Sequence, residues 1–428
     1  MRFPSVVLLA GVLSLAACES VSDSGPTGPF TLSLPEPWPG STVYVSSPDF
    51  RRGFTSATLR VDTFTIQLTK SALNDSTVSG TLPTSVSGEL TTEVTVNDTR
   101  FPTRTLTVAG FAGLRTIPGS TAAFIGEIYP WLKSGVASII GETDLRTRLL
   151  DLEQGTVRDL TSVPAVPDVY PGASATYRAG VYARKGANNT VDEWDFNGAP
   201  VVESQGISSQ TGWVHTRLGP NLWMAGDDDY TWFFTRSGPG APYIQSERFP
   251  AALYGTNFSP RGDLLAIVGA RNLAPFPVYS LPSGTVAFTV PMRAVRQSAF
   301  SQDGNLLVSV GETPTPVPSQ RRLVIQDANN GAVRLDTTFT EDIVAVAGDP
   351  TQPRFYAALR TATGQLVIQV YSTTTLQPIA RLATPQADRS VGAGVIVVSP
   401  LKGLYFYLPE DLAPVQSRIW HFTLPESN

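Results

Sequence analysis

Three consecutive carboxylates between two tryptophans are the residues of this sequence that most resemble a chemical site. Asp227, Asp228 and Asp229 lie between Trp223 and Trp232. Carboxylate oxygens are ligands that Ca²⁺ prefers, and indole rings offer planes on which a sugar can stack. The aspartates lack the spacing of a calcium loop, so a solvated acidic turn is the competing interpretation, and packing competes with stacking for the tryptophans. These five residues are candidates for ligand binding, and we expect no metal ion.

Residues typical of catalysis are sparse. The two histidines, His215 and His421, are far apart in the sequence, and Cys18 is the only cysteine. None of the usual signatures of serine nucleophiles, zinc sites or phosphate-binding loops is present. A carboxylate pair contributed by distant segments remains possible for an enzyme, so enzymatic activity stays open, with a non-catalytic role favoured and no cofactor expected.

The amino terminus predicts export and lipid attachment. Arg2 precedes an apolar stretch from Val6 to Ala17, which is too short to span about 30 Å of hydrocarbon as a helix. It therefore fits a cleaved signal peptide over residues 1–17. The sequence Leu15-Ala16-Ala17-Cys18 resembles the lipobox of bacterial lipoproteins. That resemblance implies lipidation of Cys18 and anchoring to a membrane, and Glu19 after the cysteine favours the outer membrane. An ordinary secretory signal with an incidental cysteine is the alternative.

The charge of the chain argues against nucleic acid as a partner. The full sequence has 31 basic and 36 acidic residues, a formal net charge of −5. Removal of residues 1–17 takes away one arginine and no acid, which leaves −6. Phosphate backbones bind basic surfaces, so we expect other partners. The lone cysteine also leaves no disulfide to stabilise the exported chain.

Two segments precede the larger part of the chain. Residues 18–29 are rich in Ser, Pro and Gly, which is typical of a flexible linker. Residues 30–103 are rich in Thr, Ser and Val, with alternating apolar positions between turn signals. This pattern predicts a small β-sandwich of the immunoglobulin-like type.

The rest of the sequence repeats. An apolar strand followed by a short turn with glycine recurs, and its glycines are spaced by 43, 40, 46 and 47 residues. These turns contain Gly155, Gly198, Gly238, Gly284 and Gly331, each after an apolar run such as Trp232-Phe233-Phe234 or Leu323-Val324-Ile325. A sixth copy surrounds Ile368 to Tyr371, and a seventh begins at Ile419.

A second pattern keeps the same period. Phe258-Ser259-Pro260-Arg261-Gly262-Asp263-Leu264-Leu265 recurs 42 residues later at Phe300 to Leu307, and more loosely at Val398 to Tyr405. These copies resemble the repeats of YVTN-type and WD-repeat propellers, although the histidine and Trp-Asp landmarks of true WD repeats are absent. The period of about 40 to 50 residues is that of a propeller blade. The expected fold is thus all-β, with a seven-bladed β-propeller over residues 104–428.

The last blade needs a strand from elsewhere in the chain. After the third strand of the seventh repeat the sequence ends, which would leave an unpaired sheet edge. Arg104-Thr105-Leu106-Thr107-Val108 alternates suitably, so we expect it to supply the fourth strand and close the ring. Its alternative position is the final strand of the β-sandwich.

Loop lengths indicate where a ligand would bind. Turns from the first to the second strand and from the third to the fourth lie on one face, and they are short. Long connections from the second to the third strand lie on the other face, at Gly269 to Pro277, Gly311 to Gln320 and Pro409 to Gln416. Binding residues concentrate on such loops, although tolerated insertions explain their length equally well.

Three functions remain open at this stage. The favoured one is a non-catalytic envelope lipoprotein whose propeller binds a protein, peptide or glycan. The competing one is a hydrolase or lactonase-like enzyme with carboxylates in the central channel, because YVTN-type relatives include enzymes. A weaker third is an assembly factor that pairs a partner's strand with an exposed blade edge.

Overall fold

The computed structural model describes most of the chain outside its first 29 residues. The described residues are 30–35, 37–52, 54–116, 129–130, 136–140, 147–152, 154, 156–159, 169–174, 177–185, 190–194, 200–206, 214–219, 222–226, 231–238, 241–242, 244–245, 255–268, 276–281, 283–312, 321–387, 394–399, 403–408 and 418–425. Within these ranges the regular structure is β-strand apart from one short 3₁₀ helix, η1 (Pro48–Arg52). No helix there is long and apolar enough to cross a bilayer. The all-β prediction is confirmed.

Residues 30–108 form two antiparallel sheets. The first has the order β1 (Thr31–Ser33), β2 (Thr42–Ser46), β6 (Thr77–Thr81), β5 (Thr69–Lys70). The second has the order β4 (Phe64–Gln67), β3 (Ala57–Val61), β7 (Gly88–Val96), β8 (Thr99–Arg100), and β9 (Arg104–Val108) also pairs with β7. Alternate residues of β2 and β3 are buried, so each strand covers an apolar core with one face and meets water with the other.

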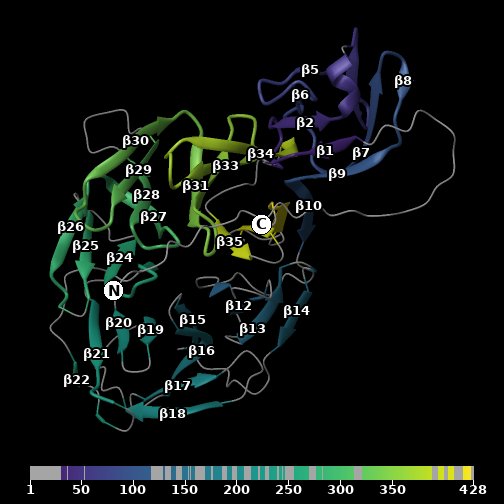
Figure 1. The fold of residues 1–428 in the computed structure, drawn as a ribbon. Helices are drawn as coiled ribbons and strands as arrows, with labels where there is room; N and C mark the ends of the chain where they lie inside the picture. Colours follow the sequence, from purple (N-terminus) through teal and green to yellow (C-terminus); the bar gives the residue numbers. More distant parts are fainter. Residues whose placement is uncertain are drawn as a thin grey trace, which may run out of the picture. The chain divides into compact units, whose positions relative to one another are not determined.

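Four-stranded antiparallel sheets make up the described part of residues 110–423, and six of the seven use consecutive strands (Figure 1). These six are β11 (Tyr129–Pro130), β12 (Val136–Ile140), β13 (Thr147–Asp151), β14 (Thr156–Asp159); β15 (Val169–Ser174), β16 (Tyr177–Lys185), β17 (Thr190–Trp194), β18 (Pro200–Gly206); β19 (Val214–Gly219), β20 (Leu222–Gly226), β21 (Thr231–Thr235), β22 (Ile244–Gln245); β23 (Gly255–Phe258), β24 (Leu264–Val268), β25 (Phe276–Ser280), β26 (Val286–Val290); β27 (Arg293–Phe300), β28 (Leu306–Glu312), β29 (Arg321–Asp327), β30 (Val333–Phe339); and β31 (Asp342–Gly348), β32 (Arg354–Arg360), β33 (Gln365–Ser372), β34 (Pro378–Ala387).

The seventh sheet joins strands from the two ends of this region. β35 (Val395–Ser399), β36 (Gly403–Leu408) and β37 (Arg418–Thr423) are completed by β10 (Gly110–Thr116), which pairs with β37. First strands of successive sheets lie beside one another, as in the pairs β23 and β27, β27 and β31, and β31 and β35. β35 in turn lies beside β11, so the last sheet meets the first.

The closing strand is not the predicted one. Arg104 to Val108 form β9, which pairs with β7, and the fourth strand of the last sheet is β10, six residues later. Leu106 and Val108 are buried, so their alternation serves the amino-terminal sheet. In β10, Gly110 and Gly113 interrupt the alternation of apolar and polar side chains in the sequence. The register of β10 with β37 also shifts between Phe111 and Gly113. A strand that precedes the first repeat does complete the last sheet, as predicted. That strand is β10, however, and not residues Arg104 to Val108.

Middle strands of the sheets are buried on both faces. In β28, β32 and β33 the five or six central residues are all buried, whereas the outermost strands β26 and β30 are mostly exposed. A strand with both faces covered reads as a continuous apolar run. The sheets that contain these strands are therefore packed against neighbours along their middle, and water reaches their outer edge.

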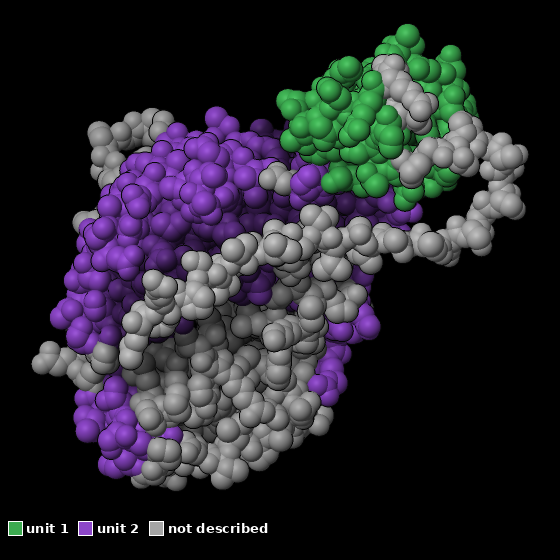
Figure 2. Space-filling model, in the orientation of Figure 1, with its two compact units in different colours: residues 1–33, 43–80, 92–104 green, residues 34–42, 81–91, 105–428 purple. Residues whose placement is uncertain are grey.

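The contacts divide the chain into two units, and the division differs from the predicted boundary between residues 103 and 104 (Figure 2). Residues 34–42 and 81–91 group with the large unit that continues from Thr105. Trp38 accounts for the first of these segments, because it is 2% exposed and belongs to the same core cluster as Tyr356, Phe406 and Trp420. The amino-terminal sequence thus contributes a buried side chain to the core of the large unit.

Candidate functional site

Two nearly identical turns explain the second sequence repeat. The backbone N–H of Ser259 donates to Leu264 at 3.0 Å, and that of Ser301 donates to Leu306 at 2.9 Å. Each serine hydroxyl also accepts from the N–H of the same leucine, at 3.1 and 2.9 Å. The glycines of the two turns, Gly262 and Gly304, have φ of +72° and +71°, which a side chain would disfavour. Ser recurs because its hydroxyl accepts the leucine N–H, and Gly recurs because its position has a positive φ.

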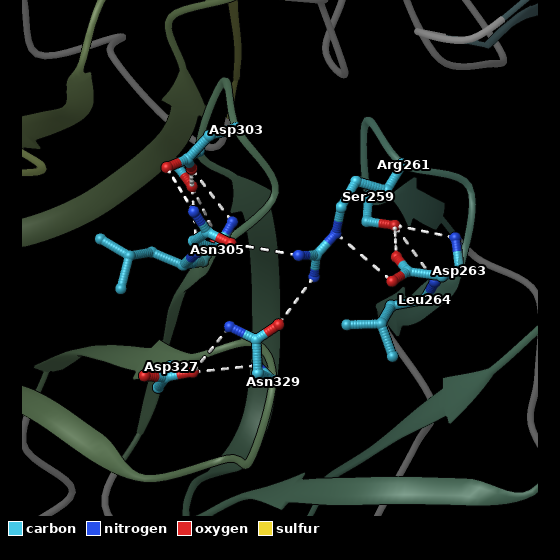
Figure 3. A network of polar contacts seen from close by, with 10 residues as sticks. Ser259, Arg261, Asp263, Leu264, Asp303, Asn305, Asp327 and Asn329 are labelled. Carbon is cyan, nitrogen blue, oxygen red and sulfur yellow. Dashed lines mark hydrogen bonds and ion pairs between the residues drawn. The ribbon is translucent and has the colours of Figure 1, made fainter. Parts of the chain in front are cut away.

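Arg261 connects these turns across neighbouring sheets (Figure 3). Its Nη1 donates to Oδ1 of Asn305 at 3.1 Å, and its Nη2 donates to Oδ1 of Asn329 at 3.2 Å. Its Nε lies 3.3 Å from Oδ2 of Asp263. Each asparagine is itself held by an aspartate. Asn305 donates to Asp303 at 2.7 Å, and Asn329 donates to Asp327 at 3.2 Å. The guanidinium group is thus surrounded by acceptors from its own turn and from two turns of the next sheet.

A third copy of the turn uses an aspartate. Asp349 occupies the position of Ser259 and Ser301, and its carboxylate accepts from the N–H groups of Thr351 and Gln352, both at 2.9 Å. Tyr356 donates its hydroxyl to the other oxygen at 2.6 Å. Burial and the neighbouring Asp349 carboxylate raise the pKa of Tyr356 well above its usual value. The sequence repeat missed this copy because both the serine and the glycine are replaced.

These turns define a short-turn face, at the ends of the first and third strands of the sheets β23 to β26, β27 to β30 and β31 to β34. The connections there between β23 and β24, β27 and β28, and β31 and β32 are five residues long. On the opposite loop face, where second strands end and third strands begin, three connections have seven to nine residues. They follow β24, β28 and β36, and all of their residues lie outside the described ranges.

The loop face carries an ionic cluster at its strand ends. Arg321 begins β29, Asp342 begins β31 and Arg360 ends β32. Nη2 of Arg321 pairs with Oδ1 of Asp342, and Nη2 of Arg360 pairs with Oδ2. Burial alone would raise the pKa of Asp342, but the two arginines outweigh it and the pKa is lowered. The carboxylate is therefore held ionised between guanidinium groups from two adjacent sheets.

Two further pairs lie near this cluster in the chain. Arg322 donates from Nε to Oδ1 of Asp336 at 2.6 Å, and this hydrogen bond lowers the pKa of Asp336. Arg381 lies 3.0 Å from Oε1 of Glu341, and it lowers the pKa of that carboxyl. Each of these arginines has its own carboxylate, whereas Arg321 and Arg360 converge on one.

Most residues of the predicted site lie outside the part of the chain that the structure describes. Cys18 and Asp227 to Asp229 lie outside the described residues. Trp223 in β20 is opposite Phe234, and Trp232 in β21 is opposite Ala225, and nothing is described of the two indole side chains. In the part of the chain that is described, no group of three His, Cys, Asp or Glu side chains is arranged to hold a metal ion. His421 stacks on Tyr405, with ring centroids 4.5 Å apart.

The ionic cluster was not predicted from the sequence. Arg321, Asp342 and Arg360 are separated by about 20 residues each and belong to no motif. The repeat does give a partial signal, because all three fall at the boundaries of strands whose positions the period predicts. Their convergence depends on how two neighbouring sheets pack against each other. The spacing of the repeats in the sequence carries no information about that packing.

Comparisons with known proteins identify the fold only. No protein-family model and no curated protein matches the chain. Among solved structures, a chain of the mitotic checkpoint complex is similar, with a TM-score of 0.51 and 15% identity over 74% of this chain and 95% of that one. The β-propeller domain of Cps50 (Swd1) from Myceliophteria thermophila has a TM-score of 0.48 and 12% identity, covering 74% of this chain and all of that domain. The large unit is a β-propeller that resembles WD40 propellers in structure.

Proposed function

We propose that this chain is a lipid-anchored protein of the bacterial cell envelope whose propeller binds a partner through its loop face. The propeller has seven blades, one for each four-stranded sheet, with β10 as the exchanged fourth strand of the last blade. The residues before it form a small β-sandwich that acts as a spacer or a second binding module. A diacylated Cys18 holds the mature chain on the outer membrane.

The difference between the two faces supports this proposal. On the short-turn face, side chains such as Ser259, Arg261 and Asp349 form hydrogen bonds with groups of the turns themselves. On the loop face, Arg321, Asp342 and Arg360 pair at strand ends and remain 21 to 34% exposed. Arg261 on the short-turn face is also partly exposed, at 37%, so the observation that favours the loop face is that three of its connections between second and third strands have seven to nine residues.

Affinity capture tests the binding role. The full chain, tagged and solubilised with its native membranes in a mild detergent, should co-elute with one envelope component in stoichiometric amounts. The double variant Arg321→Ala/Arg360→Ala should lose that component. The variant Arg261→Ala, which alters the short-turn face, should retain it. Capture of nothing specific, or equal capture by both variants, would contradict the proposal.

Lipid attachment is tested separately. Cells supplied with a labelled fatty acid should transfer the label to the wild-type chain. Cys18→Ser should abolish the label and release the chain from the membrane fraction, because a single position carries the anchor. A labelled Cys18→Ser chain, or an unlabelled wild-type chain, would contradict lipidation at this residue.

A further inference from the structure

The strand that closes the ring is weak by its own composition. β10 is the end strand of the last sheet, where its neighbour is β37. Two of its residues, Gly110 and Gly113, have no side chain to pack, and Leu114 is 45% exposed. Glycine inside a strand weakens that strand. The pairing of β10 with β37 therefore depends on contacts from outside the sheet.

Residues that precede β10 in the sequence hold its start. The backbone N–H of Ala109 donates to the carbonyl oxygen of Pro37 at 2.7 Å. The next residue, Gly110, lies so close to Ser87 that an added Cβ would be 2.3 Å from the Cβ of that serine. The N–H of Gly110 also donates to Oγ1 of Thr423 in β37 at 3.1 Å. The first residue of β10 thus contacts both the preceding sequence and the strand with which β10 pairs.

A single buried side chain anchors the segment that makes the first of these contacts. Residues 34–42 group with the large unit, and Trp38 is 2% exposed while the other residues described in this segment are half-buried or exposed. Trp38 belongs to the same core cluster as Ala109, Trp420 and Phe422, of which the last two lie in β37. One indole therefore joins this segment to the start of β10 and to its partner strand.

The contact of Trp38 is balanced so that it can open and close. The guanidinium of Arg354 lies 5.0 Å from the centre of the indole ring, and this cation–π contact favours the seated indole. However, Nη1 of Arg354 is buried without a hydrogen-bond partner, and water would satisfy this donor once the indole withdrew. Pro35, Pro37 and Pro39 restrict the backbone around Trp38, so the segment loses little entropy when it returns.

We propose that residues 34–42 form a latch that controls closure of the ring. While Trp38 is seated, β10 stays paired with β37. When Trp38 withdraws, β10 detaches and the backbone groups of β37 that paired with it become accessible. The six other sheets stay folded, because each consists of consecutive strands and none includes β10. The latch is independent of the binding role proposed for the loop face.

Hydrogen exchange of backbone amides, followed by mass spectrometry on the full chain in detergent, tests the latch. In the wild-type protein, residues 111–116 should exchange at least about tenfold faster than β36 of the same sheet. Low concentrations of urea should leave their rate unchanged, because they open locally. Trp38→Ala should accelerate exchange in residues 111–116 by about 100-fold, since the seated state loses its buried anchor.

Two further variants separate a latch from ordinary core packing. Leu307→Ala is the matched control, because Leu307 is 0% exposed in β28 and its truncation lowers the overall stability comparably. It should leave exchange in residues 111–116 unchanged. Trp38→Phe keeps an aromatic ring near Arg354, so it serves if the alanine variant fails to fold. It should accelerate exchange in residues 111–116 by about tenfold and leave β28 unchanged.

Three results would overturn the latch. The first is a wild-type β10 as well protected as β36. The second is equal acceleration of residues 111–116 in Trp38→Ala and Leu307→Ala, which would make Trp38 an ordinary core residue. The third is unchanged exchange in both Trp38 variants, which would show that Trp38 does not hold β10 in place.

Discussion

The carbonyl oxygen of Phe300 lies 2.1 Å from the point that a Cβ atom would occupy on Gly348. Phe300 ends β27 and Gly348 ends β31, so this contact joins the first strands of two neighbouring sheets. A Cβ atom cannot approach a backbone oxygen so closely, and the two strands lie this near only because the residue is glycine. The contact shows how tightly the inner strands of the propeller are packed.

Gly348→Ala should therefore destabilise the propeller. The added methyl group must push two packed strands apart, and overpacking of this kind costs about 1–3 kcal/mol. Gly113→Ala in β10 is the matched control, because a Cβ there meets nothing within 4 Å. Urea unfolding of the two variants measures the difference. A Gly348→Ala protein as stable as Gly113→Ala would refute the close packing of β27 and β31.

Trp38→Ala should destabilise the large unit although Trp38 precedes it in the sequence by about 70 residues. Trp38 is 2% exposed, with the guanidinium of Arg354 5.0 Å above its ring, and the N–H of Ala109 donates to the adjacent Pro37. Removing a buried tryptophan costs about 3–5 kcal/mol. Phe64→Ala, at a position that is 40% exposed, should cost much less. Equal unfolding midpoints for the two variants would contradict the assignment of residues 34–42 to the large unit.

The sequence predicted the parts of the fold that local hydrogen bonds repeat. The glycine-marked hairpins coincide with third strands such as β25 and β29, and the Ser-Gly turns coincide with the junctions after β23 and β27. The Ser-Gly pattern recurs because in each turn a serine hydroxyl accepts a backbone N–H and a glycine adopts a positive φ. Such local patterns can be found from their regular spacing in the sequence alone.

Features that depend on packing between sheets escaped prediction. β10 was missed because Gly110 and Gly113 break its alternation, and Gly110 is required where a Cβ would lie 2.3 Å from Ser87. The ionic cluster of Arg321, Asp342 and Arg360 was missed because its members come from three strands of two sheets. Trp38 was missed for the same reason, since its partners follow it by more than 300 residues.

Arg261→Ala should loosen the turns of the short-turn face without unfolding the protein. Its side chain is 37% exposed, so its contacts with Asn305, Asn329 and Asp263 contribute about 0.5–1 kcal/mol in total. Amide hydrogen exchange in residues 301–306 and 327–331 should accelerate, because these turns lose their shared donor. Arg100→Ala, which removes an exposed ion pair with Glu93 in the amino-terminal sheet, is the control. Unchanged exchange in both turns would show that Arg261 does not connect them.

Acid should weaken the interface between the sheets that share Asp342. Its pKa is lowered from 3.8 in the folded protein, so the unfolded chain binds the proton more readily. The stability that Asp342 contributes is present above the unfolded pKa and is lost as the pH falls through the folded pKa. The thermal midpoint should therefore drop below about pH 4, and it should drop less in Asp342→Asn than in wild type. Asp75→Asn, at an exposed turn position, should follow the wild-type curve, and an Asp342→Asn curve that also does so would refute this role.

Site-specific photocrosslinking in intact envelopes tests most directly whether the loop face is the binding surface. A benzophenone amino acid replaces Ala362, which is exposed in the connection from β32 to β33, or Gln302, which is exposed in the turn from β27 to β28. The account predicts a discrete crosslinked partner from position 362 and none from position 302. A partner captured from position 302 alone would place binding on the short-turn face and contradict the account.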